Sequence, residues 1–449
     1  MPDETARLRR WQTITVATLF TGYAGYYVCR SNLSVATPLL LDEYGSRGLT
    51  KGHIGDVASL GVLLYAVGKL VNGVATEYVG GKRMFLFGIF GSVACTVLFA
   101  LAPLLAGPLA GAAGGLGLPV AVLLPFFLVW AVNRFVQSMG WNGLVQIASR
   151  WFTASRMATV MGVLSMSYLL GDALARLFLG GVVRAGLGWQ GVFHVAAATL
   201  GLIGLVTIFA LKNRPGELRL PEPPPPPDNV YGDDRGHGRL PLAKLLVPLL
   251  TSFTFWLVCL MNVGLTLIRE TFNLWNPTYL TEVVKLDAGT AGMASFVFPL
   301  AGALSAIFSG WLVDRLGGAY GRVVVVSLVG LVAVLLLLAT LPLEGRAWLA
   351  LVVIGAAAFF LLAPYTFCSG VLAVKLGGQR GGATAAGIID TAGYLGAVVS
   401  GSVVGRIAEI HGWGTAFASL AGVAGVTLAV AAVYALRRPP TPPGQPHES

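Results

Sequence analysis

GVATEYVGGKR at residues 73–83 and GWLVDRLGGAYGR at residues 310–322 are two copies of one pattern. Each begins with glycine, carries an acidic residue four positions later (Glu77 or Asp314), has a second glycine after three more, and then becomes basic. A single short pattern of this kind is weak evidence. Two copies in distant parts of one chain indicate an internal repeat.

Two arginines strengthen the case for a repeat. Arg30 lies 43 residues before the first pattern, and Arg269 lies 41 residues before the second. Each arginine sits in an apolar stretch, eight residues before a proline, Pro38 or Pro277. We therefore expect two halves that share one plan, each carrying a buried arginine at a matched place.

The composition places these halves in a bilayer. Hydrophobic residues make up 55% of the 449 residues and charged residues only 11%, which indicates a polytopic membrane protein. We expect an all-α membrane protein of twelve transmembrane helices in two pseudo-symmetric six-helix bundles, with a central cavity between the halves. The predicted spans begin near Trp11, Ile54, Met84, Val120, Ala158, Val192, Leu245, Ala291, Val323, Trp348, Ala383 and Trp413.

The basic residues predict the topology. The net charge is +10, but most Lys and Arg residues outside the spans fall on the side of the N-terminus, as the positive-inside rule requires of cytoplasmic segments. Both termini are therefore predicted to be cytoplasmic, and a nucleic-acid partner is not expected. The predicted parts are a bundle at 1–212, a proline-rich linker at 213–243, a second bundle at 244–438 and a tail at 439–449.

Catalytic and metal chemistry find no support in the residue pattern. The four cysteines lie in or beside apolar spans without paired metal spacing, and the five histidines are scattered over loops and span ends. We expect no metal, no cofactor and no enzymatic activity.

The arginines lie on polar helical faces. Tyr23, Tyr27 and Arg30 share one face by their spacing, and Arg269 and Asn273 share another. A polar stripe in an apolar span must face protein or water, because lipid cannot satisfy its hydrogen bonds. The second span carries Tyr65 and, one helical turn later, Lys69, which adds a third cation. Converging cations of this kind predict an anion site, and phosphate monoesters fit two guanidinium forks and an ammonium.

The paired patterns resemble the loop motif of the major facilitator superfamily, which lies between helices two and three and again between eight and nine. The resemblance implies that Glu77, Arg83, Asp314 and Arg322 are gate residues that latch cytoplasmic helix ends. The alternative is that they cap helices and set the topology.

A narrower resemblance covers the spans. The chain is similar to the organophosphate:phosphate antiporter family through five stretches: residues 22–32, Tyr65 with Lys69, Gln137 to Trp141, Arg269 to Tyr279, and Gly387 to Gly396. The resemblance implies that Arg30 and Arg269 bind phosphate and that Lys69 assists. It implies further that four tyrosines line the pathway, namely Tyr23, Tyr27, Tyr65 and Tyr394.

Several residues depart from the family pattern. Ser31 replaces a basic residue, Leu274 replaces an acidic one, and Tyr168 stands where glycerol-3-phosphate carriers have histidine. These departures leave the organic part of the substrate and any proton linkage open.

Further charges in the spans have alternative roles. Asp172 and Arg176 are spaced to form an ion pair one turn apart. Arg134 is a candidate for proton coupling, for pairing with Asp172 or for capping a polar patch. Glu270 follows Arg269 directly, so we expect it to point about 100° away and not to neutralise it. Asp390 is a candidate counter-ion, proton acceptor or ligand of substrate hydroxyls.

The leading hypothesis is a monomeric secondary transporter, in a bacterial inner membrane, that exchanges a small organophosphate for inorganic phosphate by alternating access. One alternative is a membrane sensor of external sugar phosphate. The other is proton-coupled transport of another organic anion, with Asp172, Glu270 or Asp390 titrating.

Overall fold

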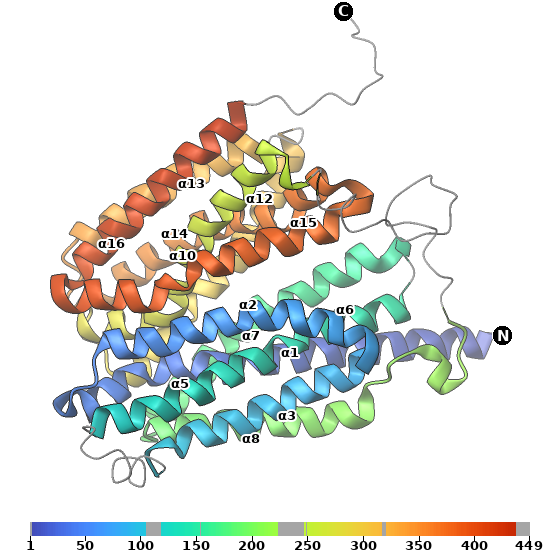
Figure 1. Ribbon diagram of the computed structural model, residues 1–449, viewed down its shortest axis with the longest axis horizontal. Coiled ribbons are helices and arrows are strands. Elements are labelled where there is room, and N and C mark those ends of the chain that lie inside the picture. The colour runs from blue at the N-terminus through green and yellow to red at the C-terminus, as the bar shows by residue number, and fades with distance from the viewer. Residues whose placement is uncertain are drawn as a thin grey trace, which may run out of the picture.

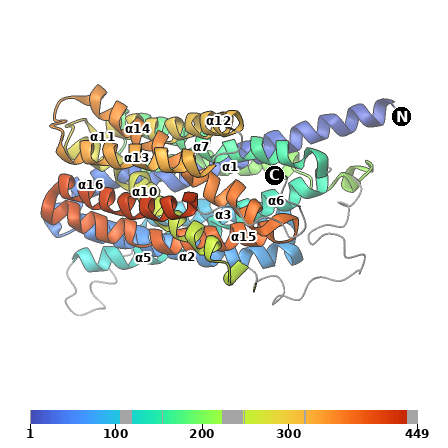
Figure 2. The same ribbon diagram turned by 90° about the horizontal axis from the view of Figure 1, so that it is seen from above.

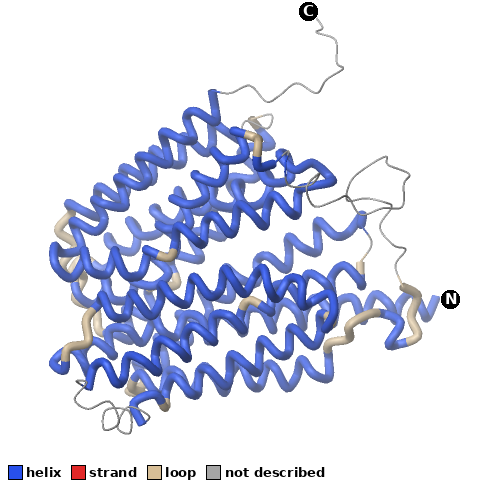
Figure 3. Tube along the Cα trace, viewed as in Figure 1, coloured by secondary structure: helices blue, strands red, loops and turns tan. Residues whose placement is uncertain are grey.

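The computed structural model describes residues 2–104, 118–152, 154–222, 247, 249–316 and 320–436. Regular structure in these residues is entirely helical, without strands (Figure 3). The expected all-α fold class is confirmed. The proline run Pro223–Pro227 and the tail at 439–449 lie outside the described residues.

Long helices run lengthwise through the molecule, side by side (Figures 1 and 2). Their bounds are α1 Pro2–Tyr44, α2 Lys51–Val79, α3 Gly81–Ala100, α5 Leu118–Gln137, α6 Met139–Trp151, α7 Ala154–Arg184, α8 Trp189–Ala210, α10 Phe253–Glu282, α11 Ala288–Ala294, α12 Val297–Arg315, α13 Tyr320–Thr340, α14 Ala347–Thr366, α15 Ala373–Ala397 and α16 Val399–Leu436. Short 3-10 turns follow α1 at Gly45–Arg47 and α8 at Pro215–Leu218, and a π-helical turn at Phe367–Leu372 joins α14 to α15.

The helices form two groups. Helices α1 to α8 lie on one side and α10 to α16 on the other, and the chain starts at the right-hand end of Figure 1, opposite the end where α1 leads into α2. Across the interface α2 packs against α15 and α16, α7 packs against α11 and α12, and α1 packs against α10. Helices from corresponding places in the two halves therefore meet in reciprocal pairs.

The outward faces of the helices suit a bilayer. Large apolar side chains stay exposed there, with Phe209 at 76% and Ile410 at 71%. Such exposure on so many helices is typical of a surface covered by lipid rather than by water.

The count of spans is less regular than expected. By length and composition, nine candidate spans occur among the described residues, and one of them, Gly387–Leu436, covers the last two predicted spans. Helix α16 is kinked inside this stretch at Gly412, which has a φ of 81°. Glycine adopts this value without strain because it has no Cβ. The kink falls where the last span is predicted to begin. Twelve spans are therefore not reproduced as twelve separate helices.

Some helices begin several residues away from the predicted starts of their spans. The seventh span is expected near Leu245, but α10 begins at Phe253 because the Ser252 side chain caps it by accepting a hydrogen bond from the Phe255 N–H. The eleventh is expected near Ala383, but α15 begins at Ala373. In the latter case the helix continues through the glycine-rich residues 377–382, which precede the predicted start.

The first of the repeated patterns forms a tight turn between helices. Gly80, with φ of 90°, separates α2 from α3. The Lys82 ammonium then donates a hydrogen bond of 2.8 Å to the Ile208 carbonyl. Arg83 and Arg322 are exposed, whereas the side chains of Glu77 and Asp314 lie outside the described part of the structure. The gate function of these residues stays a prediction.

Candidate functional site

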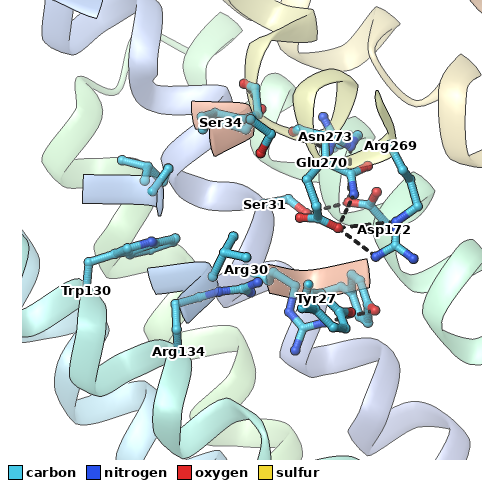
Figure 4. A pocket seen from close by; sticks show the side chains of 17 residues that line it. Tyr27, Arg30, Ser31, Ser34, Trp130, Arg134, Asp172, Arg269, Glu270 and Asn273 are labelled. Atoms are coloured by element: carbon cyan, nitrogen blue, oxygen red, sulfur yellow. Dashed lines mark hydrogen bonds and ion pairs between the residues drawn. The ribbon is translucent and has the colours of Figure 1, made fainter. Parts of the chain in front are cut away.

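A polar cavity lies between the two halves and receives side chains from both (Figure 4). It is lined by Tyr27, Arg30, Ser31, Leu33 and Ser34 of α1, Ala58 and Val62 of α2, Trp130 and Arg134 of α5, Asp172 and Arg176 of α7, Arg269, Glu270, Asn273 and Leu274 of α10, Tyr394 of α15 and Ser400 of α16. Because polar stripes of the two groups of helices face each other here, the cavity holds an unusual concentration of charge for an apolar protein.

Arg30 is held by residues of its own half. Its Nε donates to Gln137 Oε1 at 3.2 Å and its Nη1 donates to Tyr27 Oη at 3.0 Å. The guanidinium carbon lies 4.6 Å from the ring centre of Tyr27 and 4.7 Å from that of Tyr65. Its Nη2 is buried and has no hydrogen-bond partner among the described residues. A donor left in this state is costly, and it is available to a bound acceptor.

Arg269 faces the same cavity from the other half. Its guanidinium lies 4.5 Å from the ring centre of Tyr365. Nη2 donates to Glu270 Oε1 at 2.7 Å, and Nε donates to the same oxygen at 3.2 Å. The expectation that Glu270 points away from Arg269 was therefore wrong. The Cβ atoms do diverge around the helix, but both side chains are long enough to bend back and meet.

Lys69 lies beside the cavity rather than in its lining. The ring centres of Tyr65 and Tyr394 are 5.3 Å apart across the two halves, and the Lys69 ammonium lies 5.6 and 5.8 Å from them. Asp390 is half-buried and interacts electrostatically with Lys69 and Arg269. The structure thus places Asp390 near the cations, and its three alternative roles stay predictions.

Tyr23 is also set back from the cavity. It is buried and packs against Tyr26, Tyr27 and Trp141, with ring centres 5.3 to 6.0 Å apart. Of the predicted substrate-binding residues, the cavity lining thus includes Arg30, Arg269, Tyr27, Asn273 and Tyr394, but not Lys69, Tyr23, Tyr65 or Asp390.

The additional charges form two networks. In the first, Gln137 Oε1 accepts from both Arg30 and Arg134, each at 3.2 Å. Arg134 therefore bonds to Gln137 rather than pairing with Asp172. The Arg134 guanidinium also lies 4.8 Å from the ring centre of Tyr65.

The second network joins the halves. Asp172 Oδ1 accepts from Ser31 Oγ at 2.5 Å and from Arg176 Nε at 3.1 Å, so the predicted ion pair on α7 is confirmed. Arg176 extends further, because its Nη1 donates to Ser295 Oγ at 3.3 Å and its Nη2 donates to the Asn273 carbonyl at 2.8 Å.

Sequence reasoning missed the roles of Gln137 and Tyr365 and part of the role of Arg176. Gln137 stands out in the sequence only as part of a motif, although its place one turn after Arg134 could have indicated a shared network. Arg176 is expected only as the partner of Asp172. Tyr365 carries no local signal, since it lies in an apolar helix, α14, that comes from far along the chain.

Known proteins resemble this chain over most of its length. The family described as Major Facilitator Superfamily matches residues 19–401. The chain is 26% identical over 436 residues to the membrane sensor protein UhpC of Salmonella typhimurium, covering 94% of this chain and 91% of the relative.

Three further comparisons concern named transporters. A probable hexose phosphate transport protein of Chlamydia pneumoniae is 23% identical over 440 residues, covering 94% of this chain and 90% of the relative. The glycerol-3-phosphate transporter of Bacillus subtilis is 24% identical over 414 residues, covering 90% and 87%. Among solved structures, a mutant of the nucleoside transporter NupG superposes with a TM-score of 0.65 at 15% identity, covering 94% of this chain and 99% of that one, which shows a shared fold.

Proposed function

The chain belongs to the major facilitator superfamily, within its organophosphate:phosphate antiporter family, and we propose that it exchanges a phosphorylated small organic molecule for inorganic phosphate by alternating access. The substrate class that we propose is sugar phosphate or glycerol phosphate, which the names of its relatives support. It is an integral membrane protein. We place it in a bacterial inner membrane, as a monomer of two six-helix bundles with both termini cytoplasmic.

The observation that carries the proposal is the buried Nη2 of Arg30, unpartnered among the described residues, in one cavity with Arg269. Four arginines and two carboxylates line this cavity, so its net charge is +2 when all six groups are ionised. A phosphate monoester carries up to two negative charges and several acceptor oxygens. It would neutralise the cavity and supply the acceptor that Arg30 lacks.

Alternating access is supported by contacts between the halves at the end opposite the N-terminus. Lys51 Nζ pairs with Glu282 at 2.9 Å, and Arg406 Nη2 pairs with Asp56 at 2.5 Å. The Gly52 N–H also donates to Glu409 at 3.1 Å. We propose that these contacts close the external side in the present state and part in the other one.

Neutralisation would link binding to this movement. Bringing the two halves together over an empty cavity would hold the positive charges of the arginines close together in a low dielectric, where their repulsion is strong. A bound anion lowers this repulsion, so the free-energy cost of the movement is smaller. Obligatory exchange follows, because the carrier would reorient readily only when it is loaded.

The test is counterflow in proteoliposomes loaded with inorganic phosphate and supplied with labelled phosphate and a panel of sugar phosphates. We expect exchange by the wild type. Arg30→Lys should reduce the exchange rate at least about a hundredfold, because a point charge does not replace a bidentate fork. Arg269→Ala should reduce it as much, because it removes the charge and all the donors of the guanidinium. Arg346→Ala removes an exposed arginine and serves as control. No uptake by the wild type, or Arg30→Lys behaving like it, would refute the proposal.

A second candidate function is favoured by the UhpC relative, whose name describes a membrane sensor. A sensor would bind external sugar phosphate at the same cavity without carrying flux. Binding of sugar phosphate by the purified protein, combined with absence of counterflow, would support the sensor over the transporter.

A further inference from the structure

Glu270 forms an ion pair with Arg269, the cation of the second half that we expect to bind substrate. Its Oε1 accepts three hydrogen bonds, from Arg269 Nη2 at 2.7 Å, from Arg269 Nε at 3.2 Å and from Asn273 Nδ2 at 3.2 Å. The Arg269 and Glu270 side chains are only 13% and 11% exposed. The pair is therefore shielded from water on most sides, where a charge interaction is stronger than at a surface.

Glu270 binds the edge of the Arg269 guanidinium that carries Nε and Nη2, which is an edge that phosphate could also bind. Nε and one Nη form one of the two donor pairs by which a guanidinium binds two oxygens of a carboxylate or phosphate. Here a single carboxylate oxygen takes both donors. A phosphoryl group that approached the same edge would offer two oxygens in place of one.

The position of the carboxylate relative to the other half is equally informative. Glu270 interacts electrostatically with Arg134 and Arg30, both from the first half, as well as with its neighbour Arg269. In Figure 4 its side chain points into the space that the labelled arginines surround. Among the described residues that line the cavity, the only carboxylates are Glu270 and Asp172, and Asp172 is already engaged with Ser31 and Arg176.

We propose that Glu270 is the resident counter-anion of the empty cavity, and that the phosphoryl group of the substrate displaces it from Arg269. This inference rests on the proposed function. It adds that Glu270 competes with the phosphoryl group for Arg269. Bound Glu270 lowers the repulsion among the arginines while no substrate is present. On displacement it gives up Arg269, which weakens net phosphate binding and speeds release.

Glu270→Gln is the direct test, because glutamine keeps the shape and an acceptor oxygen but removes the charge. We expect the dissociation constant of inorganic phosphate, measured by titration of the detergent-purified protein, to fall on the order of tenfold. We expect the maximal rate of phosphate exchange in proteoliposomes to fall as well, since release is slower. Glu344→Gln removes an exposed carboxylate in a loop and should change neither quantity.

Glu270→Asp provides a second variant in case the first is poorly folded. Its shorter side chain withdraws from Arg269 while keeping the charge nearby, so phosphate affinity should rise by less than in Glu270→Gln. Unchanged or weakened phosphate binding in both variants would overturn the inference. So would a loss of thermal stability without a gain in affinity, which would show that the ion pair only supports the fold.

The two proposals fail in different ways. If the wild type binds no phosphate, the proposed function fails. If the wild type binds phosphate and Arg30→Ala abolishes this binding, but Glu270→Gln does not tighten it, the function stands and the counter-anion is excluded.

Discussion

Arg176 Nη2 donates a hydrogen bond of 2.8 Å to the backbone carbonyl of Asn273, and the two residues belong to opposite halves of the molecule. Pro277 is the reason that this carbonyl is available. It lies inside α10, and proline has no N–H to donate to the carbonyl four residues earlier. Arg176 thus satisfies an acceptor that the helix leaves open, and in doing so links α7 to α10 beside the cavity.

We predict that Arg176→Lys slows exchange without weakening phosphate binding. Lysine can pair with Asp172 but cannot also reach Ser295 and the Asn273 carbonyl with a planar fork. The link between the halves is then lost, whereas Arg30 and Arg269 remain. The maximal exchange rate should fall about tenfold, with little change in the KM for phosphate, since a buried charged hydrogen bond is worth roughly 1.5–3 kcal/mol.

Arg184→Lys is the matched control, because Arg184 lies on the same helix and is exposed. A rise in KM at constant rate in Arg176→Lys would contradict the prediction, since it would mean that Arg176 binds substrate directly.

We predict that Lys51→Glu opens the end of the molecule opposite the N-terminus. It places two carboxylates together where Lys51 and Glu282 now pair, and Glu282 also accepts from Trp413 Nε1 at 2.7 Å. The pair is partly exposed, so only a few-fold shift in population is expected. The reporter is labelling of Ser59→Cys by a membrane-impermeant thiol reagent, because Ser59 is buried on the same helix, where it contacts Ser402 of the other half, and the four native cysteines are buried.

The swapped double variant Lys51→Glu with Glu282→Lys tests whether the effect is electrostatic. Labelling of Ser59→Cys should return towards the wild-type rate in this background. Equal labelling in the single and double variants would show that the pair does not hold this end closed.

The helices and the importance of Arg30 and Arg269 could be predicted from the sequence, because both depend on local pattern. Apolar spans of the right length, polar faces at helical spacing and the repeat around Glu77 and Asp314 are all visible in the chain. Glu270 was misjudged because helical geometry gives the direction of Cβ but not the rotamer of a long side chain. The link from Arg176 to the Asn273 carbonyl depends on how two distant helices pack, and no local signal carries that information.

We predict that exchange does not require a pH gradient. Asp390 is the strongest candidate for a proton acceptor, as a half-buried carboxylate near Lys69 and Arg269. In proteoliposomes without internal phosphate or organophosphate, an imposed pH gradient should drive no uptake, in the wild type or in Asp390→Asn. Uptake in the wild type that Asp390→Asn abolishes would instead establish proton coupling through this residue.

A close backbone approach between the halves predicts a steric block. A Cβ added at Gly55 of α2 would overlap the carbonyl oxygen of Gly401 on α16, and one added at Gly401 would overlap that of Gly55. Backbone cannot yield as a flexible side chain would, so Gly55→Leu should hold this end apart. We expect exchange to fall by at least about tenfold and labelling of Ser59→Cys to rise. Gly422→Leu, on an exposed face of α16 with no atom within 4 Å of an added Cβ, should leave both unchanged. Normal exchange by Gly55→Leu would show that α2 and α16 need not meet here during the transport cycle.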